Sequence, residues 1–299
     1  MDSFTPKPVE DCYHVYSDGT RVTVLCETDE DYVFMMNLIA VVTYYCHLKI
    51  LSLEVMRTHF HIILRGKEKE VKKCRRELKR LIVKRYNKMG RGDLVQNSIT
   101  IQADPIRDDE ELRRKIIYVF RNCTEAGYEF LPEDYEWGPG HVYCHPETRH
   151  FKKVADLDYR DQCRLFKTRV KLPEGWEYNL KGMLVPASYI DKVFLRKNVF
   201  RTPRQFIAFL NVRKHDLAEM EAADARPFLE KREEGKLLLE LKKAALEQFG
   251  TELGHLPKAD KIVLATRFWN EGKTHSVKQL ARLTKTDAEM LRSLFHLNR

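Results

Sequence analysis

The order of strand-like and helix-like segments in the first 125 residues limits most strongly how this chain can fold. Short runs rich in β-branched and aromatic residues predict strands, and apolar residues at a helical period predict helices. By these criteria the strands cover residues 13–16, 22–25, 48–56, 59–64 and 98–101, and the helices cover residues 29–46, 67–88 and 109–123. Asp18 and Gly19 separate the first two strands, which indicates a hairpin.

This alternation predicts an α+β fold with one antiparallel sheet that carries helices on one face, and the ferredoxin-like fold is the expected architecture. From residue 127 to residue 150, prolines, glycines and aromatic residues accumulate, so this stretch is expected to be irregular and to end the first domain. Helical patterns dominate the remainder. The sequence therefore predicts a first domain over residues 1–150 and a mostly α-helical domain over residues 151–299.

The chain carries 53 Lys and Arg residues against 44 Asp and Glu residues, and its formal net charge of +9 favours a polyanionic partner such as DNA. Its longest uncharged stretch, residues 32–48, contains Asn37 and His47 and is shorter than the ~20 apolar residues of a membrane helix, so no membrane association is expected. The seven cysteines are scattered and form no Cys-x-x-Cys pair, so we expect a cytoplasmic protein. The sequence leaves open whether the chain acts as a monomer or a homodimer.

Two histidines stand at alternate positions of the predicted strand Thr58-His59-Phe60-His61-Ile62. The period of two directs His59 and His61 to one face and Phe60 and Ile62 to the other. Two neighbouring imidazoles are spaced to share a metal ion. A His-x-His strand on its own is more often a partly exposed polar pair, so other residues must decide between the two interpretations.

The predicted helix over residues 109–123 carries a tyrosine on its polar side. Leu112, Ile116 and Phe120 lie within one arc and belong to the apolar face, whereas Tyr118 falls about 200° away from Ile116 at about 100° per residue. Asn122 follows Tyr118 by one turn, so its amide oxygen and the phenol oxygen point the same way. The helix alone is equally consistent with a surface tyrosine and a functional one.

These residues carry a resemblance to a known family. The segment from residue 51 to residue 64, with His59-Phe60-His61, resembles the strand pair ending in the His-hydrophobic-His motif of the single-tyrosine HUH transposases. Residues Tyr118 to Gly127 resemble the tyrosine helix of the REP-associated tyrosine transposases, where the pattern is Tyr-Ile-x-x-Asn-Pro-Val-x-Ala-Gly. Several motifs in the right order, covering about the first half of the chain, are more specific than any one of them.

Two further segments are similar to that family, Tyr13-His14-Val15 and Pro132-Glu133-Asp134-Tyr135-Glu136-Trp137. Two positions depart from it: the chain has Arg57-Thr58 where the family usually has Pro-Asn, and Asn122-Cys123 where it has Asn-Pro. The chain therefore resembles a divergent member of the family.

The resemblance implies an HUH nuclease domain that nicks and rejoins single-stranded DNA at hairpin-forming repeats. It implies that Tyr118 is the nucleophile, which forms a 5′-phosphotyrosine, and that His59, His61 and Asn122 hold a metal ion. Mixed nitrogen and oxygen ligands are compatible with Mg²⁺ or Mn²⁺, which the resemblance favours over zinc. Two alternatives remain: a hairpin-binding regulator that has lost turnover, and a related HUH nuclease of replication or plasmid transfer.

A strongly basic stretch follows the histidine strand. Between Arg65 and Arg91 there are 13 Lys and Arg residues against three Glu residues. Charge runs usually form solvated helix faces, but this helix directly follows the histidine strand, which would bring its basic face close to the metal and to DNA phosphates. The residues that we expect to contact DNA here are Arg65, Lys72, Lys73, Arg76 and Lys79.

Two short helices predicted near the C-terminus carry cap signals, Ser276 with Gln279 before the first and Thr286-Asp287 before the second. Two capped helices with facing apolar residues are typical of a helix-turn-helix, expected here over residues 275–296, although an ordinary helical hairpin fits equally well. Lys285 and Arg292 are the residues expected to contact DNA there.

Overall fold

The computed structural model describes residues 11–17, 24–90, 99–125, 132–143, 151–202, 204–207, 234–274 and 276–295. The chain divides into two compact units, each with its own hydrophobic core. The first comprises Met1–Asn122 and Phe130–Phe206, and the second comprises Cys123–Glu129 and Ile207–Arg299. The first unit therefore extends past residue 150, where the sequence places the domain boundary.

A four-stranded sheet forms the centre of the first unit. Its strands are β1 (Cys12–Ser17), β2 (Lys49–Val55), β3 (Phe60–Arg65) and β4 (Ile101–Pro105). They are ordered β2-β3-β1-β4, and each neighbouring pair is antiparallel. The predicted antiparallel sheet in a mixed α+β unit is thus confirmed, with β1 and β3 as its central strands.

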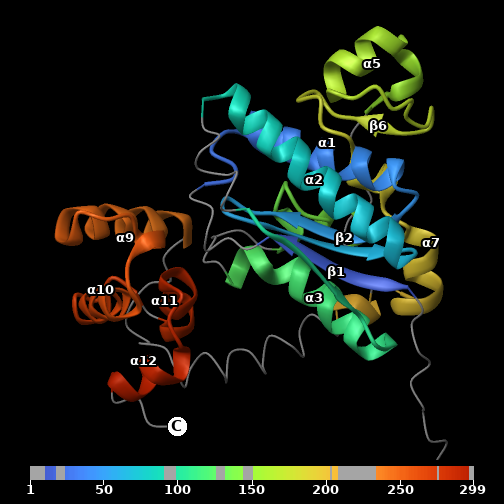
Figure 1. Cartoon of the computed structure of the whole chain (residues 1–299). Coiled ribbons are helices and arrows are strands. Elements are labelled where there is room, and N and C mark those ends of the chain that lie inside the picture. The colour runs from blue at the N-terminus through green and yellow to red at the C-terminus, as the bar shows by residue number, and fades with distance from the viewer. Residues whose placement is uncertain are drawn as a thin grey trace, which may run out of the picture. The chain divides into compact units, whose positions relative to one another are not determined.

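Helices cover both faces of this sheet, whereas the sequence predicts helices on one face only (Figure 1). The three long helices of the unit are α1 (Asp29–Tyr45), α2 (Glu68–Lys88) and α3 (Asp109–Glu125). α1 and α2 lie on one side of the sheet and α3 lies on the other. Because α1 and α2 already cover the first face, α3 can bury its apolar arc only on the second face.

The alternation of β3 decides which of its side chains reach each face. Phe60, Ile62 and Leu64 are fully buried on the side of α1 and α2. His61 points to the side of α3, where its ring lies 5.3 Å from that of Tyr118. Tyr16 on β1 is the cross-strand partner of His61, so it shares the α3 face.

α1 contains most of the longest uncharged stretch of the sequence and packs as a core helix, as expected. Its first turn is fixed by a capping box in which the Thr28 side chain accepts from Asp31 N, and the Asp31 carboxylate accepts from Thr28 N. Within the described part of the chain, no helix combines the length and the apolar character needed to cross a membrane.

Two predicted strands differ from the structure. Val24 and Leu25 are buried but lie outside any strand, because the N–H groups of Leu25 and Cys26 donate to Arg57 O, at 2.7 and 2.9 Å, and not to a neighbouring strand. The rest of the expected hairpin, residues 18–23, lies outside the described residues. β4 begins at Ile101, the last residue of the strand expected over residues 98–101, and continues for four more residues.

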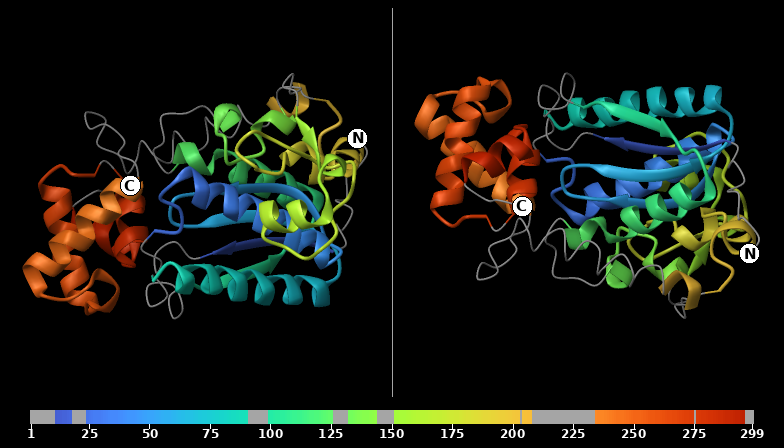
Figure 2. Two further views of the ribbon diagram at one scale, coloured as in Figure 1. Left: turned by 90° about the horizontal axis from the view of Figure 1, so that it is seen from above. Right: turned by 90° about the horizontal axis from the view of Figure 1, so that it is seen from below.

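Residues 151–202 pack beside α1 and the β2 edge of the sheet, as the yellow segment in Figure 2 shows. With residues 132–143, they contain η2 (Pro132–Asp134), α4 (Gly140–Tyr143), β5 (Lys152–Lys153), η3 (Val154–Asp156), α5 (Tyr159–Phe166), β6 (Glu177–Tyr178), α6 (Pro186–Tyr189), α7 (Lys192–Phe194) and η4 (Leu195–Val199).

The side chain of Asn37 explains why residue 150 is not a boundary. Asn37 is buried within α1, and its amide donates to Gly182 O at 2.9 Å and accepts from Leu184 N at 2.7 Å. Ile190 also forms a parallel bridge with Ile50 on β2. Since a buried amide is costly without partners, the first unit needs the segment that follows residue 150.

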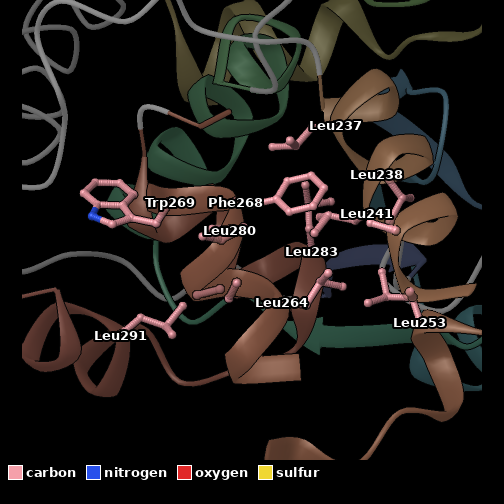
Figure 3. Close-up of a cluster of buried hydrophobic side chains, with 14 of the residues drawn as sticks. Leu237, Leu238, Leu241, Leu253, Leu264, Phe268, Trp269, Leu280, Leu283 and Leu291 are labelled. Atoms are coloured by element: carbon pink, nitrogen blue, oxygen red, sulfur yellow. The ribbon is translucent and has the colours of Figure 1, made fainter. Parts of the chain in front are cut away.

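The second unit is helical in its described residues, as predicted. Its elements are α9 (Glu234–Phe249), η5 (Leu253–His255), α10 (Lys258–Asn270), α11 (Val277–Thr284) and α12 (Ala288–Leu294). Their apolar side chains meet in one cluster that includes Leu264, Phe268 and Leu280 (Figure 3). Ser276 caps α11 as expected, whereas Asp287, and not Thr286, caps α12.

Candidate active site

The two predicted histidines lie together on the α3 face of the sheet. His59 immediately precedes β3 and His61 is its second residue, and both side chains are buried. Their ring centroids are 5.0 Å apart and the ring planes are at 85°. The period of two in the strand therefore places both imidazoles at one end of the sheet, as the sequence predicts.

Each of these imidazoles is held through its Nδ1 atom. Thr58 Oγ1 lies 2.9 Å from His59 Nδ1, and His14 Nε2 on β1 lies 3.0 Å from His61 Nδ1. A metal-binding histidine commonly uses one ring nitrogen for the ion and fixes the orientation of its ring through the other. The pattern observed here suits coordination through the two Nε2 atoms.

The third histidine, His14, is uncharged at neutral pH. Burial, together with the positive charge of Lys115, lowers the pKa of His14 to about 4, against the opposing effect of Asp104. A neutral imidazole has one N–H donor and one acceptor nitrogen. His14 can therefore share a single hydrogen bond with His61 without placing a positive charge beside the histidine pair.

α3 brings two more predicted residues to the same place. Asn122 is 1% exposed, and its amide nitrogen lies 3.2 Å from His59 Nε2. Tyr118, one helical turn earlier, is partly buried, and its ring centroid lies 5.3 Å from that of His61 and 6.0 Å from that of His14. The four residues predicted to form the catalytic site thus gather between β3 and α3.

The donor atoms of this cluster decide whether it fits a divalent ion. Across the described residues, no group of three or more His, Cys, Asp or Glu side chains is arranged to hold a metal. The histidine pair consequently needs Asn122, whose amide offers an oxygen as well as a nitrogen. Two imidazoles and one amide oxygen are ligands that Mg²⁺ and Mn²⁺ accept, although they prefer oxygen. The residues present fit such an ion.

Three polar residues at this site were not identified from the sequence: His14, Thr58 and Glu54. Glu54 on β2 is the cross-strand partner of His61 and is fully buried, and its carboxylate reaches toward Gly138. The alternation of the first strand places His14 on the face that Tyr16 also occupies. His14 reaches His61 only because β1 pairs with β3, and this pairing depends on the strand order and not on the local sequence.

Three of the predicted DNA-contacting residues share one groove. Lys72, Arg76 and Lys79 line a groove of about 820 Å³ along α2 and β4, and its other cationic lining residues are Lys69, Arg75 and Arg80. The Arg75 guanidinium donates to Ile101 O on β4 at 2.6 and 2.9 Å. α2 and α3 cover opposite faces of the sheet, so the expectation that this basic face adjoins the histidine pair is wrong.

The other predicted DNA contacts lie elsewhere. Arg65 forms an ion pair with Asp191 at 3.0 Å and stacks on Phe194, and Lys73 lies over the ring of Tyr45, with its Nζ 4.0 Å from the centroid. These intramolecular contacts hold both side chains against the protein. Lys285 and Arg292 belong to the second unit, at the end of α11 and within α12.

Comparison with known proteins adds little to this geometry. No protein-family model matches the chain, and no curated protein matches it. A solved structure of a REP-associated tyrosine transposase bound to a REP hairpin is similar at 13% sequence identity and a TM-score of 0.32, over 48% of this chain and 85% of that chain. A similarity of this size carries no functional argument, which has to come from the site itself.

Proposed function

We propose that this chain is a metal-dependent nuclease and strand transferase that acts on single-stranded DNA, with Tyr118 as its nucleophile. The observation that carries the proposal is the gathering of Tyr118, Asn122, His59 and His61, in which both histidines are oriented through Nδ1. The succession β1-α1-β2-β3-α2-β4 with the strand order β2-β3-β1-β4 supports a ferredoxin-like HUH nuclease domain.

The proposed reaction exchanges one phosphate ester for another. The Tyr118 oxygen forms a bond to phosphorus while the bond from phosphorus to the 3′ oxygen breaks, and the proton lost by the tyrosine balances the proton gained by the leaving hydroxyl. The product is a 5′-phosphotyrosine with a free 3′-hydroxyl. Because the ester bond is kept, a second 3′-hydroxyl can reverse the reaction and rejoin the strand.

The residues of this chain would divide the work as follows. His59, His61 and Asn122 would hold the ion, and His14 and Thr58 would keep the two imidazoles in a fixed orientation. Mg²⁺ or Mn²⁺ supplies positive charge that polarises the scissile phosphate.

The groove along α2 and β4 supports a DNA substrate. Arg76 and Lys79 form no ion pair within the described part of the chain, whereas Lys72 is paired with Glu68 at 2.6 Å. Cationic side chains that are not already paired can neutralise phosphates and release counterions. We assign the groove to the sugar-phosphate backbone of a hairpin stem.

In the second unit, α11 and α12 are proposed to contact DNA as a helix-turn-helix. The three residues from Lys285 to Asp287 connect them, and Lys285 adopts a left-handed backbone conformation with a φ of 55°. Lys285 and Arg292 are basic residues at these helices, which supports a role in holding phosphates.

The nucleophile can be tested against a matched tyrosine. Tyr16 also lies beside His61, at a ring distance of 5.9 Å, but its hydroxyl donates to Gln102 and Asp104. With Mn²⁺ and hairpin-forming single-stranded DNA, wild type and Tyr16→Phe should form a covalent adduct that resists denaturation, and Tyr118→Phe should not. An adduct from Tyr118→Phe would falsify the assignment.

A wild-type chain that binds the hairpin tightly and never forms an adduct would favour the alternative, a hairpin-binding regulator without turnover. Binding has to be measured for all three proteins, because Tyr118→Phe removes only the attacking oxygen and should leave affinity nearly unchanged.

A further inference from the structure

Lys115 lies on the same side of α3 as Asn122, the proposed metal ligand. The two residues are seven positions apart, so at about 100° per residue they fall within about 20° of each other around the helix. Tyr118 stands between them along the helix, three residues after Lys115 and four before Asn122. All three belong to the first unit. Lys115 therefore extends the line of proposed site residues by one turn toward the beginning of α3.

The positive charge of Lys115 acts on the histidine cluster. After burial, this charge is the largest of the causes that lower the pKa of His14, the imidazole bonded to His61. Electrostatic effects weaken with distance, so the ammonium group lies on the side of α3 that faces His14. Lys115 is half-buried, and long lysine side chains keep their charged end toward water. A ligand at the site can therefore reach this charge.

No described residue neutralises Lys115. Its side chain forms no ion pair within the part of the chain that the structure describes. Asp104 is an acidic residue near the same cluster, because it acts on the pKa of His14 in the opposite direction. The Asp104 carboxylate accepts a hydrogen bond from the Tyr16 hydroxyl at 3.1 Å and forms no ion pair with Lys115. The ammonium group thus remains available to an anionic ligand.

We propose that Lys115 binds the phosphate that neighbours the scissile phosphate in single-stranded DNA. The scissile phosphate has to lie where Tyr118 and the proposed ion both reach it. At ~1.5 Å per residue, Lys115 is ~4.5 Å before Tyr118 along the helix and ~10 Å before Asn122, so it lies beyond Tyr118 as seen from the ion. The nearest further negative charge on the strand is the phosphate of the adjacent nucleotide. The assignment rests on the proposed function, and it directs the strand from the ion toward the beginning of α3.

Arg114 provides a matched control on the same helix. It is the neighbouring residue, it is exposed, and its side chain forms no ion pair with any described residue. At about 100° per residue, Arg114 lies about 80° from Asn122, on the other side of Tyr118. A contact that depends on position, and not only on charge, should therefore distinguish Lys115 from Arg114.

A methylphosphonate scan of a DNA hairpin with single-stranded flanks tests the proposal with the full chain. Each flank phosphate is replaced in turn by an uncharged methylphosphonate, and binding is measured by fluorescence anisotropy. With wild type, replacement of the contacted phosphate should weaken binding about 10-fold, the effect of one lost charge-assisted hydrogen bond. Lys115→Ala should bind the unmodified hairpin about 10-fold more weakly and should lose the response at that one position. Arg114→Ala should keep the response, and Lys115→Arg should restore it.

The position of the effect distinguishes a contact from damage to the fold. A misfolded variant loses affinity for every hairpin alike, and circular dichroism identifies it. If folded Lys115→Ala responds to every methylphosphonate as wild type does, or if Arg114→Ala loses the same response, Lys115 does not bind this phosphate.

Mapping of the phosphotyrosine on the same hairpin, in Mn²⁺, locates the cleaved phosphate. The phosphate contacted by Lys115 should be its immediate neighbour, and any other position would contradict the proposal. If no phosphotyrosine forms with any DNA, the proposed nuclease function fails, whereas the methylphosphonate scan still decides whether Lys115 binds a phosphate.

Discussion

The two faces of β3 bury different kinds of side chain, although both belong to one short strand. Toward α1 and α2 it presents Phe60, Ile62 and Leu64, which are fully buried. Toward α3 lie the imidazoles of His59 and His61, each tied through Nδ1. Apolar side chains stabilise wherever their volume fits, whereas buried polar groups are tolerated only when they are bonded. On β3 the first face is therefore wholly apolar, whereas the second face also carries polar side chains that are held by hydrogen bonds.

Neighbouring substitutions on β3 should separate stability from activity. Ile62→Ala should lower the free energy of unfolding by about 2–5 kcal/mol, because it leaves a cavity under α1 and α2. His61→Ala should cost less stability, yet it should abolish the metal-dependent adduct. Urea denaturation followed by circular dichroism, and adduct formation at a temperature where both variants are folded, measure the two effects. Equal destabilisation by the two substitutions would contradict the division between the faces.

An intermediate effect is expected from His14, which touches the site only through His61. His14→Gln should weaken Mn²⁺ binding by about 10- to 100-fold, the usual range for a residue that orients a metal ligand. Calorimetric titration with Mn²⁺ gives the affinity, and a metal titration of adduct formation should shift in parallel, with activity recovered at high Mn²⁺. If Mn²⁺ binds to His14→Gln as tightly as to wild type, the His14–His61 contact is structural only.

The smallest effect is expected on the outer side of α2, which packs on the apolar face of the sheet. Lys79→Ala should flatten the salt dependence of hairpin binding by about 0.9 in the logarithmic slope, as one phosphate contact does for duplex DNA. Lys72→Ala is the control, since Glu68 already neutralises that lysine, and it should change the slope less. Unchanged slopes for both variants across a salt series would remove this groove from the DNA-binding surface.

The elements with a strong local pattern were predictable from the sequence. The helices over residues 68–88 and 109–125 follow from apolar residues at a helical period, and the shared face of His59 and His61 follows from the period of a strand. The shared side of Tyr118 and Asn122 follows from one helical turn, whereas their roles were implied only by the family resemblance. All of these depend on interactions within a few residues.

The remainder depends on partners that are distant in sequence. His14 gains its role from the pairing of β1 with β3, which no local pattern encodes. The domain boundary expected at residue 150 overlooked that Asn37 finds its partners at Gly182 and Leu184. Val24 and Leu25 have strand-like side chains, but their segment bonds to Arg57 and forms no ladder. Their β-branched and apolar character reflects burial alone.

The bridge between Ile190 and Ile50 has a consequence for how copies of this protein meet. An outer strand with unsatisfied backbone groups is a template on which another chain can add a strand, and this is a common route to aggregation. At β2 that template is interrupted, because Ile190 bridges Ile50 and Asp191 N donates to Ile50 O at 2.8 Å. At β4, the other outer strand, the Arg75 guanidinium donates hydrogen bonds to the carbonyl oxygen of Ile101. Both edges of the sheet are thus partly covered by the chain's own residues, which hinders edge-to-edge pairing between copies of this protein.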